Sequence, residues 1–336
     1  MRIGTRGSAL ALAQASHVAK LLEAHPPCLP VDIITISTSG DSDERASASQ
    51  PSDKSRWVDT IERALLAGEI DLAVHSAKDV PGELADGLEL LGAPARAAAE
   101  DVLCGAAGLD ALLAGARVGT SSVRRAAQLR AARADLEIVT IGGNVDTRLR
   151  RLGQSREDGE RGGRTGERDE AGEQRDQDGL YADRLDAIVI ARAGLQRLGR
   201  EDEVGAVLDP ERFVPAPGQG VLALEGRAAD ARVREAVAAV TDADAFASLL
   251  AERALARALD ASCHTPLGAY AIPAGCGCLH LRAWVGLPDG SAWIGDALVG
   301  GFYDPDALGR RVAERMKAAG AEELLSRAEE LAVEHA

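Results

Sequence analysis

Lys78 and Asp79 form the charged pair whose position in the sequence most suggests chemistry. They follow a short apolar run, Leu72 to Val74, that indicates a buried strand, and Pro81 disfavours a helical conformation at Val80. The pair is therefore expected on a stiff loop at the end of a strand, where open α/β sheets bind ligands. For an isolated Lys-Asp dipeptide, the alternative is a solvated ion pair in a surface turn. The rest of the chain has to decide between the two.

Arginines close to glycine turns or helix starts are the second chemical feature. The chain has a net charge of −15, which argues against nucleic acid or an anionic membrane as a partner. In this acidic chain the arginines suit a small polycarboxylate better than a polymer. The residues in question are Arg124, Arg125, Arg148, Arg150, Arg151 and Arg197. For about half of them, ordinary solvated helix charges are the alternative.

Size and composition predict a multidomain protein of the cytoplasm. A chain of 336 residues is expected to form about two or three domains. No apolar run approaches the roughly 20 residues that span a bilayer, and the first residues lack the apolar core of a signal peptide. The five cysteines are odd in number and irregularly spaced, which favours reduced thiols over a disulfide framework.

Two similar α/β units are needed to position these residues. The first is predicted from a helix at 8–24, a strand at 33–36, a helix at 57–66 and the strand that begins at residue 72. The second is predicted from strands at 117–119, 137–141 and 187–191 and a helix at 124–132. The Pro- and Gly-rich segment 213–220 predicts a hinge or crossover, and a strand at 221–224 could return to the first unit.

The pattern changes after residue 242 to that of an α+β domain. It predicts a helix at 245–259, strands at 279–285 and 292–299 joined by a turn at Asp289-Gly290, and one final helix. The expected domains are 1–94 with about 219–240, then 98–214, then 243–336. Within the second, a charged stretch at 154–180 has almost no hydrophobic residues and is expected to be a loosely ordered loop.

Four segments in this order and spacing resemble the porphobilinogen deaminase (hydroxymethylbilane synthase) family. They are residues 2–8, 74–81, 118–125 with 143–149, and 215–220, and the resemblance extends to 262–268. The resemblance implies two α/β domains of the type 2 periplasmic-binding-protein kind and a smaller C-terminal α+β domain. It also implies a transferase of tetrapyrrole (haem) biosynthesis. Such an enzyme joins four porphobilinogen molecules head to tail with loss of ammonia, then releases hydroxymethylbilane by hydrolysis.

The resemblance assigns the central roles to Cys263 and Asp79. Cys263 matches the position that carries one covalent dipyrromethane cofactor per chain, and a thiolate is a good nucleophile for the electrophile that forms such a thioether. Without the resemblance, a buried small hydrophobe would be the preferred reading of this cysteine. Asp79 is expected to stabilise positive charge as ammonia leaves and to exchange protons. Lys78 is expected to bind a substrate carboxylate, with Schiff-base catalysis as the alternative.

The remaining site residues follow from the same resemblance. Cofactor contacts are expected from Lys78, Asp79, Thr120, Ser121, Ser122, Arg124, Arg125 and Gly143. Substrate contacts are expected from Arg6, Ser8, Gln14, Ser76, Arg148 and Arg197. Forked guanidinium groups bind carboxylates bidentately, and the Thr-Ser-Ser group at a helix N-terminus suits anions while also capping the helix.

Two departures from the family pattern concern binding. Gly142 stands where the family usually has an arginine, which Arg150 or Arg192 could replace, and Gln50 stands in place of a common lysine. No metal is expected, because Cys276, Cys278 and His280 lack a second ligand pair. His75 is expected to be a packing residue.

The expected partner is porphobilinogen, with no nucleic acid or membrane, and the expected state is a monomer. The alternative function is a non-catalytic, cytoplasmic anion-binding protein of the same architecture. Such a protein would need neither Cys263 nor a third domain.

Overall fold

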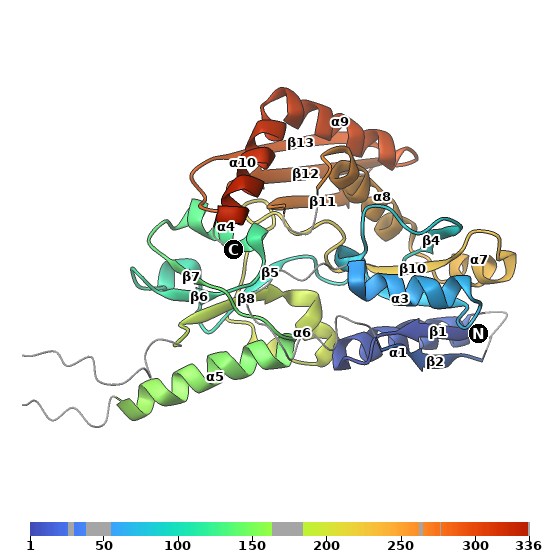
Figure 1. Ribbon diagram of the computed structural model, residues 1–336, viewed down its shortest axis with the longest axis horizontal. Helices are drawn as coiled ribbons and strands as arrows, with labels where there is room; N and C mark the ends of the chain where they lie inside the picture. Colours follow the sequence, from blue (N-terminus) through green and yellow to red (C-terminus); the bar gives the residue numbers. More distant parts are fainter. Residues whose placement is uncertain (26–29, 38–54, 163–183, 262–264, 276, 335–336) are drawn as a thin grey trace, which may run out of the picture.

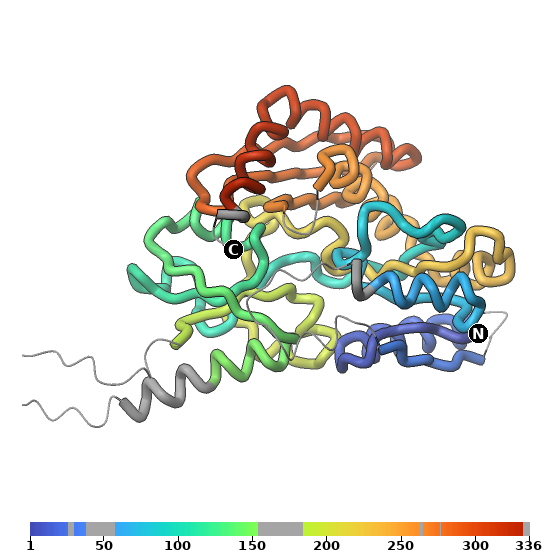
Figure 2. The backbone as a smooth tube through the Cα atoms, in the orientation of Figure 1, coloured from blue at the N-terminus to red at the C-terminus, as the bar shows by residue number. Residues whose placement is uncertain are grey.

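Three β-sheets, each with its own helices, organise the computed structural model (Figure 1). The structure describes residues 1–25, 30–37, 55–162, 184–261, 265–275 and 277–334. The tube view follows the chain from the first sheet to the second, back to the first and then to the third (Figure 2). Among the described helices, none is both long and apolar enough to cross a membrane.

The first sheet has the strand order β2-β1-β3-β10-β4. Its strands are β1 (Arg2–Thr5), β2 (Asp32–Thr35), β3 (Leu72–Ser76), β4 (Leu88–Gly92) and β10 (Leu222–Arg227). Strand β1 runs parallel to β2 and β3, whereas β10 runs antiparallel to both of its neighbours. The predicted return of the chain to the first unit is confirmed, which supports the proposal of a discontinuous first domain.

The second sheet repeats this pattern in the order β7-β6-β8-β5-β9. Its strands are β5 (Asp101–Cys104), β6 (Arg117–Gly119), β7 (Glu137–Val139), β8 (Ala187–Ala191) and β9 (Ala206–Val207). Strand β6 is parallel to β7 and β8, and β5 is antiparallel to β8 and β9. Two similar α/β units joined by two crossovers are therefore present.

Helices cover both sheets because their apolar residues recur at helical spacing. Helix α1 (Ala9–Ala24) buries Ala15, Val18 and Leu22 in the core of the first sheet, and the Ser8 hydroxyl caps it by accepting from the Ala11 N–H at 3.2 Å. The first sheet also has α3 (Ser55–Leu66) and α7 (Ala231–Ala238). The second has α4 (Val123–Ala132), α5 (Val145–Gly162) and α6 (Arg192–Leu198). Three short 3₁₀ turns are η1 (Ala77–Asp79), η2 (Leu109–Ala111) and η3 (Glu201–Glu203).

The prediction of a loose loop was wrong for residues 154–162, which continue α5 (Figure 1). The helix is anchored before this stretch, where Leu149 and Leu152 are buried. Once a helix is nucleated, each further residue adds a hydrogen bond at little cost, and Arg and Glu are good helix formers. A charged stretch can therefore extend a helix without a core of its own. The rest of the stretch, 163–180, lies outside the described residues.

The third sheet is antiparallel and packs against three helices through one shared core. It consists of β11 (Leu267–Pro273), β12 (Cys278–Gly286) and β13 (Trp293–Gly301), with α8 (Ala243–Ala258), α9 (Pro305–Ala318) and α10 (Ala321–Glu334). The predicted α+β class is confirmed. The prediction of a single final helix was wrong, because two helices are present. Gly320, with φ of 98°, separates α9 from α10.

Glu252 of α8 fastens the third sheet to both crossovers between the first two. Its fully buried carboxylate accepts from Arg96 Nη1 at 2.7 Å, the Gly218 N–H at 2.6 Å and the Ala271 N–H at 2.7 Å. Burial raises the pKa of Glu252, while Arg96 and the two backbone donors favour its ionised form. One side chain of the third unit thus holds the segments β4–β5 and β9–β10 together.

Candidate functional site

The loop that carries Lys78 and Asp79 lies at the end of β3, as predicted. Strand β3 ends at Ser76 and passes directly into η1, which contains both residues, and both side chains are partly exposed. The Ala77 N–H donates to the Val221 carbonyl at 3.0 Å, and the Val80 N–H donates back to the Ala77 carbonyl at 3.2 Å. The backbone beside the charged pair is therefore held by the residue directly before β10 and by its own turn.

Four predicted substrate contacts gather beside this loop. Strands β1 and β3 are parallel neighbours, so the residues that follow them lie at the same edge of the first sheet. Arg6 and Ser8 follow β1, and the buried Gln14 donates from Nε2 to Ser76 Oγ at 2.8 Å. Helix α1 and strand β3 are thus joined at the edge where the Lys-Asp pair lies.

A second group of candidates lies at the matching edge of the second sheet. Ser121 and Ser122 follow β6 together with the buried Thr120, and Ser122 Oγ caps α4 by accepting from the Arg125 N–H at 3.4 Å. Arg148 of α5 donates from Nη2 to Ser121 Oγ at 2.9 Å and from Nε to the Gly143 carbonyl at 2.8 Å. The loops after β6 and β7 are therefore tied to each other.

Arg124 and Arg125 differ from the other candidates because both are buried around one carboxylate. Arg124 Nη2 lies 2.8 Å from Asp101 Oδ2, and Arg125 Nε lies 2.9 Å from Asp101 Oδ1. Burial by itself would raise the pKa of Asp101, but the two guanidinium groups hold it well below its usual range, while burial lowers the pKa of Arg124. Arg124 Nη1 also donates to the Val214 carbonyl at 2.8 Å and Arg125 Nη1 to the Val189 carbonyl at 3.2 Å, whereas the buried Arg124 Nε has no hydrogen-bond partner among the described residues.

Asp101 was not predicted as a site residue from the sequence. It is the first residue of β5, a strand that was not predicted, and the only available signal was a charged residue directly before the apolar run Val102 to Cys104. A buried carboxylate of this kind indicates a nearby cation, but the sequence alone does not say which one.

The crossover 218–221 contacts both groups of candidates. Gln219 accepts from Arg125 Nη2 at 3.4 Å, and the Gly220 carbonyl accepts from Arg197 Nη2 at 2.7 Å. Gly218 has φ of 73°, and a Cβ there would come within 2.9 Å of the Ala77 Cβ. The structure thus brings the predicted residues together in two groups, one at each sheet, with this segment between them.

Arg197 is the candidate best prepared for an anion. It is partly buried, burial lowers its pKa to about 10, and within the described ranges no carboxylate forms an ion pair with it. Gly143, with φ of 92°, leaves no room for a side chain because a Cβ would come within 2.8 Å of Thr147 Cγ2. A desolvated cation without a carboxylate partner fits a ligand that carries carboxylates.

The two suggested substitutes for the missing arginine at position 142 are placed differently. Arg150 is exposed, whereas Arg192 lies 3.4 Å from a carboxylate oxygen of Glu201 and 4.0 Å from one of Glu100. Arg192 is therefore already engaged with acidic neighbours. Gln50 lies outside the described residues, as do Cys263 and Cys276.

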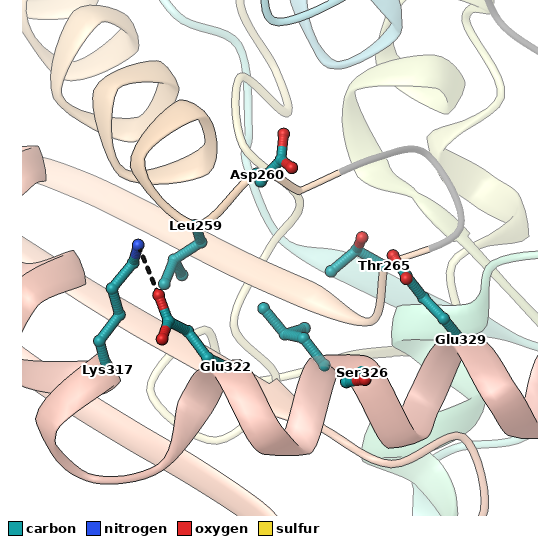
Figure 3. A pocket seen from close by; sticks show the side chains of 8 residues that line it. Leu259, Asp260, Thr265, Lys317, Glu322, Ser326 and Glu329 are labelled. Carbon is teal, nitrogen blue, oxygen red and sulfur yellow. Dashed lines mark ion pairs between the residues drawn. The ribbon is translucent and has the colours of Figure 1, made fainter.

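A cavity of about 210 Å³ in the third unit is not the candidate site (Figure 3). It lies between the end of α8 and α10, and Lys317 pairs there with Glu322 at 2.8 Å. Asp260 and Glu329 add further negative charge to its wall. The cavity is small for a drug-sized ligand and is lined by more carboxylates than cations, so it does not suit a polycarboxylate.

Comparisons with known proteins agree along nearly the whole chain. The family model described as "Porphobilinogen deaminase, dipyromethane cofactor binding domain" matches residues 1–162 and 172–235, and "Porphobilinogen deaminase, C-terminal domain" matches 246–318. A porphobilinogen deaminase of Xanthomonas euvesicatoria is 42% identical over 331 residues, covering 97% of this chain and 98% of the relative. One of Trichlorobacter lovleyi is 39% identical over 326 residues, covering 97% and 95%.

Solved structures show a more distant likeness. A periplasmic substrate-binding protein of an ABC transporter from Coxiella burnetii is 16% identical with a TM-score of 0.38, covering 71% of this chain and 91% of that one. The methionine-binding protein MetQ is 15% identical with a TM-score of 0.39, covering 71% and 89%.

Proposed function

Since the chain belongs to the porphobilinogen deaminase family, we propose that the strand ends of its two α/β units form the site where porphobilinogen units are joined. The chain is a transferase of tetrapyrrole biosynthesis: it condenses four porphobilinogen molecules with loss of ammonia and releases hydroxymethylbilane. The match to relatives over 97% of the chain carries this conclusion. A non-catalytic anion-binding protein is not favoured, because both parts of the chain match domains of the enzyme.

Asp79 is proposed as the catalytic carboxylate. As ammonia leaves porphobilinogen, positive charge develops on the pyrrole, and a fixed carboxylate near the ring nitrogen stabilises it and accepts its N–H hydrogen bond. The same carboxylate can donate a proton to the leaving amine and take up the ring proton later. The hydrogen bonds that fix the backbone on either side of Lys78 and Asp79 support this role.

Cys263 is proposed to carry the dipyrromethane cofactor, which supplies the primer to which substrate units are added. The donors of the second sheet fit a group bearing acetate and propionate carboxylates, because cations and hydroxyls converge there. The residues proposed to hold it are Lys78, Asp79, Thr120, Ser121, Ser122, Arg124, Arg125 and Gly143. In this arrangement the two cations of Arg124 and Arg125 exceed the single charge of Asp101, which favours carboxylates of the cofactor nearby.

The substrate carboxylates are proposed to meet a separate set of donors. That set is Arg6, Ser8, Gln14, Ser76, Arg148 and Arg197. Arg197 supports the proposal most directly, because burial lowers its pKa to about 10 and a bound carboxylate would compensate the desolvated charge. Lys78 contributes its ammonium group to carboxylate binding.

We also propose that the protein works as a monomer in the cytoplasm, without nucleic acid or membrane. The net charge of −15 supports the exclusion of polyanionic partners. The odd number and irregular spacing of the five cysteines support a reducing compartment.

The cofactor proposal is tested by the intact mass of the purified protein. The native chain should be heavier than its sequence by one dipyrromethane unit, the Cys263→Ala variant should have the bare mass and no turnover, and Cys278→Ala should keep the added mass. A bare native mass together with unchanged turnover in Cys263→Ala would contradict the proposal.

The role of Asp79 is tested by Asp79→Asn. The amide keeps the shape but lacks the charge, so the variant should fold, carry the cofactor mass and lose about 10²- to 10³-fold in kcat, as for other electrostatic catalytic groups. A near-normal rate would remove Asp79 from catalysis. Borohydride treatment with substrate checks the Schiff-base alternative, because only a lysine imine would be reduced to a stable adduct.

A further inference from the structure

Arg253 of α8 binds the backbone immediately after Asp79. Its Nη2 donates to the Pro81 carbonyl at 2.7 Å and to the Gly82 carbonyl at 2.9 Å, and its Nη1 donates to the Val80 carbonyl at 3.3 Å. The side chain is only 6% exposed. A single guanidinium of the third unit therefore donates to three consecutive carbonyls of the loop that carries the proposed catalytic carboxylate.

This arginine is electrostatically unusual. Its pKa is lowered to about 10, mainly by burial and to a lesser extent by the charge of Arg257, while the charges of Glu225 and Glu83 partly offset the two. Among the residues that the structure describes, no carboxylate lies within ion-pair distance of it. Burying a charge that has only carbonyl partners costs free energy. That cost favours a role for Arg253 beyond the stability of the fold.

The loop needs these donors to keep one conformation. On the side before Asp79, the Val221 carbonyl accepts from the Ala77 N–H. Further on, Glu62 Oε1 accepts from the Ala85 N–H at 3.3 Å. Between these two points the hydrogen bonds from Arg253 fix the segment 80–82, where Pro81 has no N–H of its own.

Helix α8 also connects this loop to the cysteine proposed to carry the cofactor. From Arg253 the helix runs about 7.5 Å to its end at Ala258, and Cys263 follows five residues later. The neighbouring Glu252 fastens the same turn of α8 to both crossovers. The helix is thus held in place at the level where it contacts the loop.

We infer that Arg253 is a positioning residue for the condensation: it fixes the loop of Asp79 against the helix that leads to Cys263. The inference rests on the proposed catalytic role of Asp79. Arg253 acts through the backbone of residues 80–82 and not by touching substrate.

The test compares Arg253→Met, which keeps length and packing but removes every donor, with Arg253→Lys, which keeps a charge and part of the hydrogen bonding. In cofactor-loaded protein, Arg253→Met should lower kcat by about 100-fold, as expected for a misplacement of about 1 Å, and leave KM within about threefold. Arg253→Lys should recover part of that loss. Hydrogen exchange of a peptide covering 77–85 should be faster in Arg253→Met. Arg315→Gln, which removes an exposed ion pair with Asp296, should match the native protein in all measurements.

A double-mutant cycle with Asp79→Asn separates positioning from a purely structural role. If Arg253 acts through Asp79, Arg253→Met or Arg253→Lys should slow the Asp79→Asn enzyme by no more than about twofold. Multiplicative losses, a normal kcat in Arg253→Met, or a loss that only follows the unfolded fraction would overturn the inference. If Arg253→Met does not fold, the Lys variant decides through the same cycle. Full activity of Asp79→Asn alone would refute the proposed catalytic role of Asp79, whereas a normal kcat in Arg253→Met alone would refute only the positioning role.

Discussion

Asp101 shows how a single residue can organise the binding side of the second sheet. Its carboxylate is 1% exposed, pairs with Arg124 and Arg125, and accepts from Gln219 Nε2 at 2.8 Å. The two arginines lie in the first turn of α4, separated from the Thr-Ser-Ser group by Val123. Through these contacts the carboxylate holds the N-terminus of α4, with its two arginines, next to the crossover between β9 and β10.

Asp101 should make stability depend on pH in the acidic range. Its pKa is lowered in the folded protein, so the stability it contributes is complete above its unfolded pKa of about 4 and is lost as pH falls through the lower folded value. Urea unfolding should show the free energy of unfolding of the native protein falling from pH 5 to pH 3. Asp101→Asn should unfold about 3–5 kcal/mol more easily at pH 7, because two buried arginines lose their partner, and should show a smaller fall below pH 4.

Asp135→Asn is the matched control. Asp135 forms an exposed pair with Arg133 at 2.6 Å, and such surface pairs contribute little to stability. This variant should keep most of the acid-dependent fall. Parallel curves for the native protein and Asp101→Asn would show that Asp101 is not the source of the dependence.

Among the elements, the crossover between β9 and β10 has the greatest influence on the site. Its Gly218 is buried with φ of 73° and faces Ala77, which opens η1. The same segment accepts from Arg125 and Arg197. A shift of this crossover would therefore move the Lys-Asp loop and the arginines together.

Comparing Gly218→Ala with Gly275→Ala separates the close approach of Gly218 to Ala77 from the conformational effect of losing a glycine. Both glycines have φ of 73°, so each alanine should cost about 1–2 kcal/mol from the left-handed backbone. A Cβ at Gly275 meets nothing within 4 Å, whereas one at Gly218 meets Ala77 at 2.9 Å. Thermal unfolding should show a loss in both variants, and kcat should fall only in Gly218→Ala. Equal kcat values would mean that the crossover does not position η1.

At the scale of the whole molecule, local patterns in the sequence correctly predicted elements that depend on neighbouring residues. The continuous apolar run Ala187–Ala191 is a strand with the predicted bounds, and the Lys-Asp pair lies on the predicted loop. Strand β5 was missed because it is short and begins with a charge that only a distant partner explains. The ion pair between Asp101 and Arg124 was not predicted either, because the two residues are distant in the sequence.

The contacts between units were beyond any local pattern. Arg253 and Val80 are 173 residues apart, and Arg96 and Glu252 are 156 apart. In the sequence, Glu252 and Arg253 are two charges in a helix, which normally indicates a solvated face. Only the packing of α8 against the crossovers and the Asp79 loop buries them and gives them partners.

The position of β10 also determines when the first sheet can be completed during synthesis on the ribosome. Strand β4 joins the first sheet only through β10, so the sheet stays incomplete until the chain has returned from the second sheet. At the usual speed of translation, the roughly 130 intervening residues take about 7 to 26 s. The second sheet, from β5 to β9, is synthesised in full during this interval. The nascent chain therefore leaves the edge of β3 open to chaperones, or to wrong strand pairing, until residues 222–227 emerge.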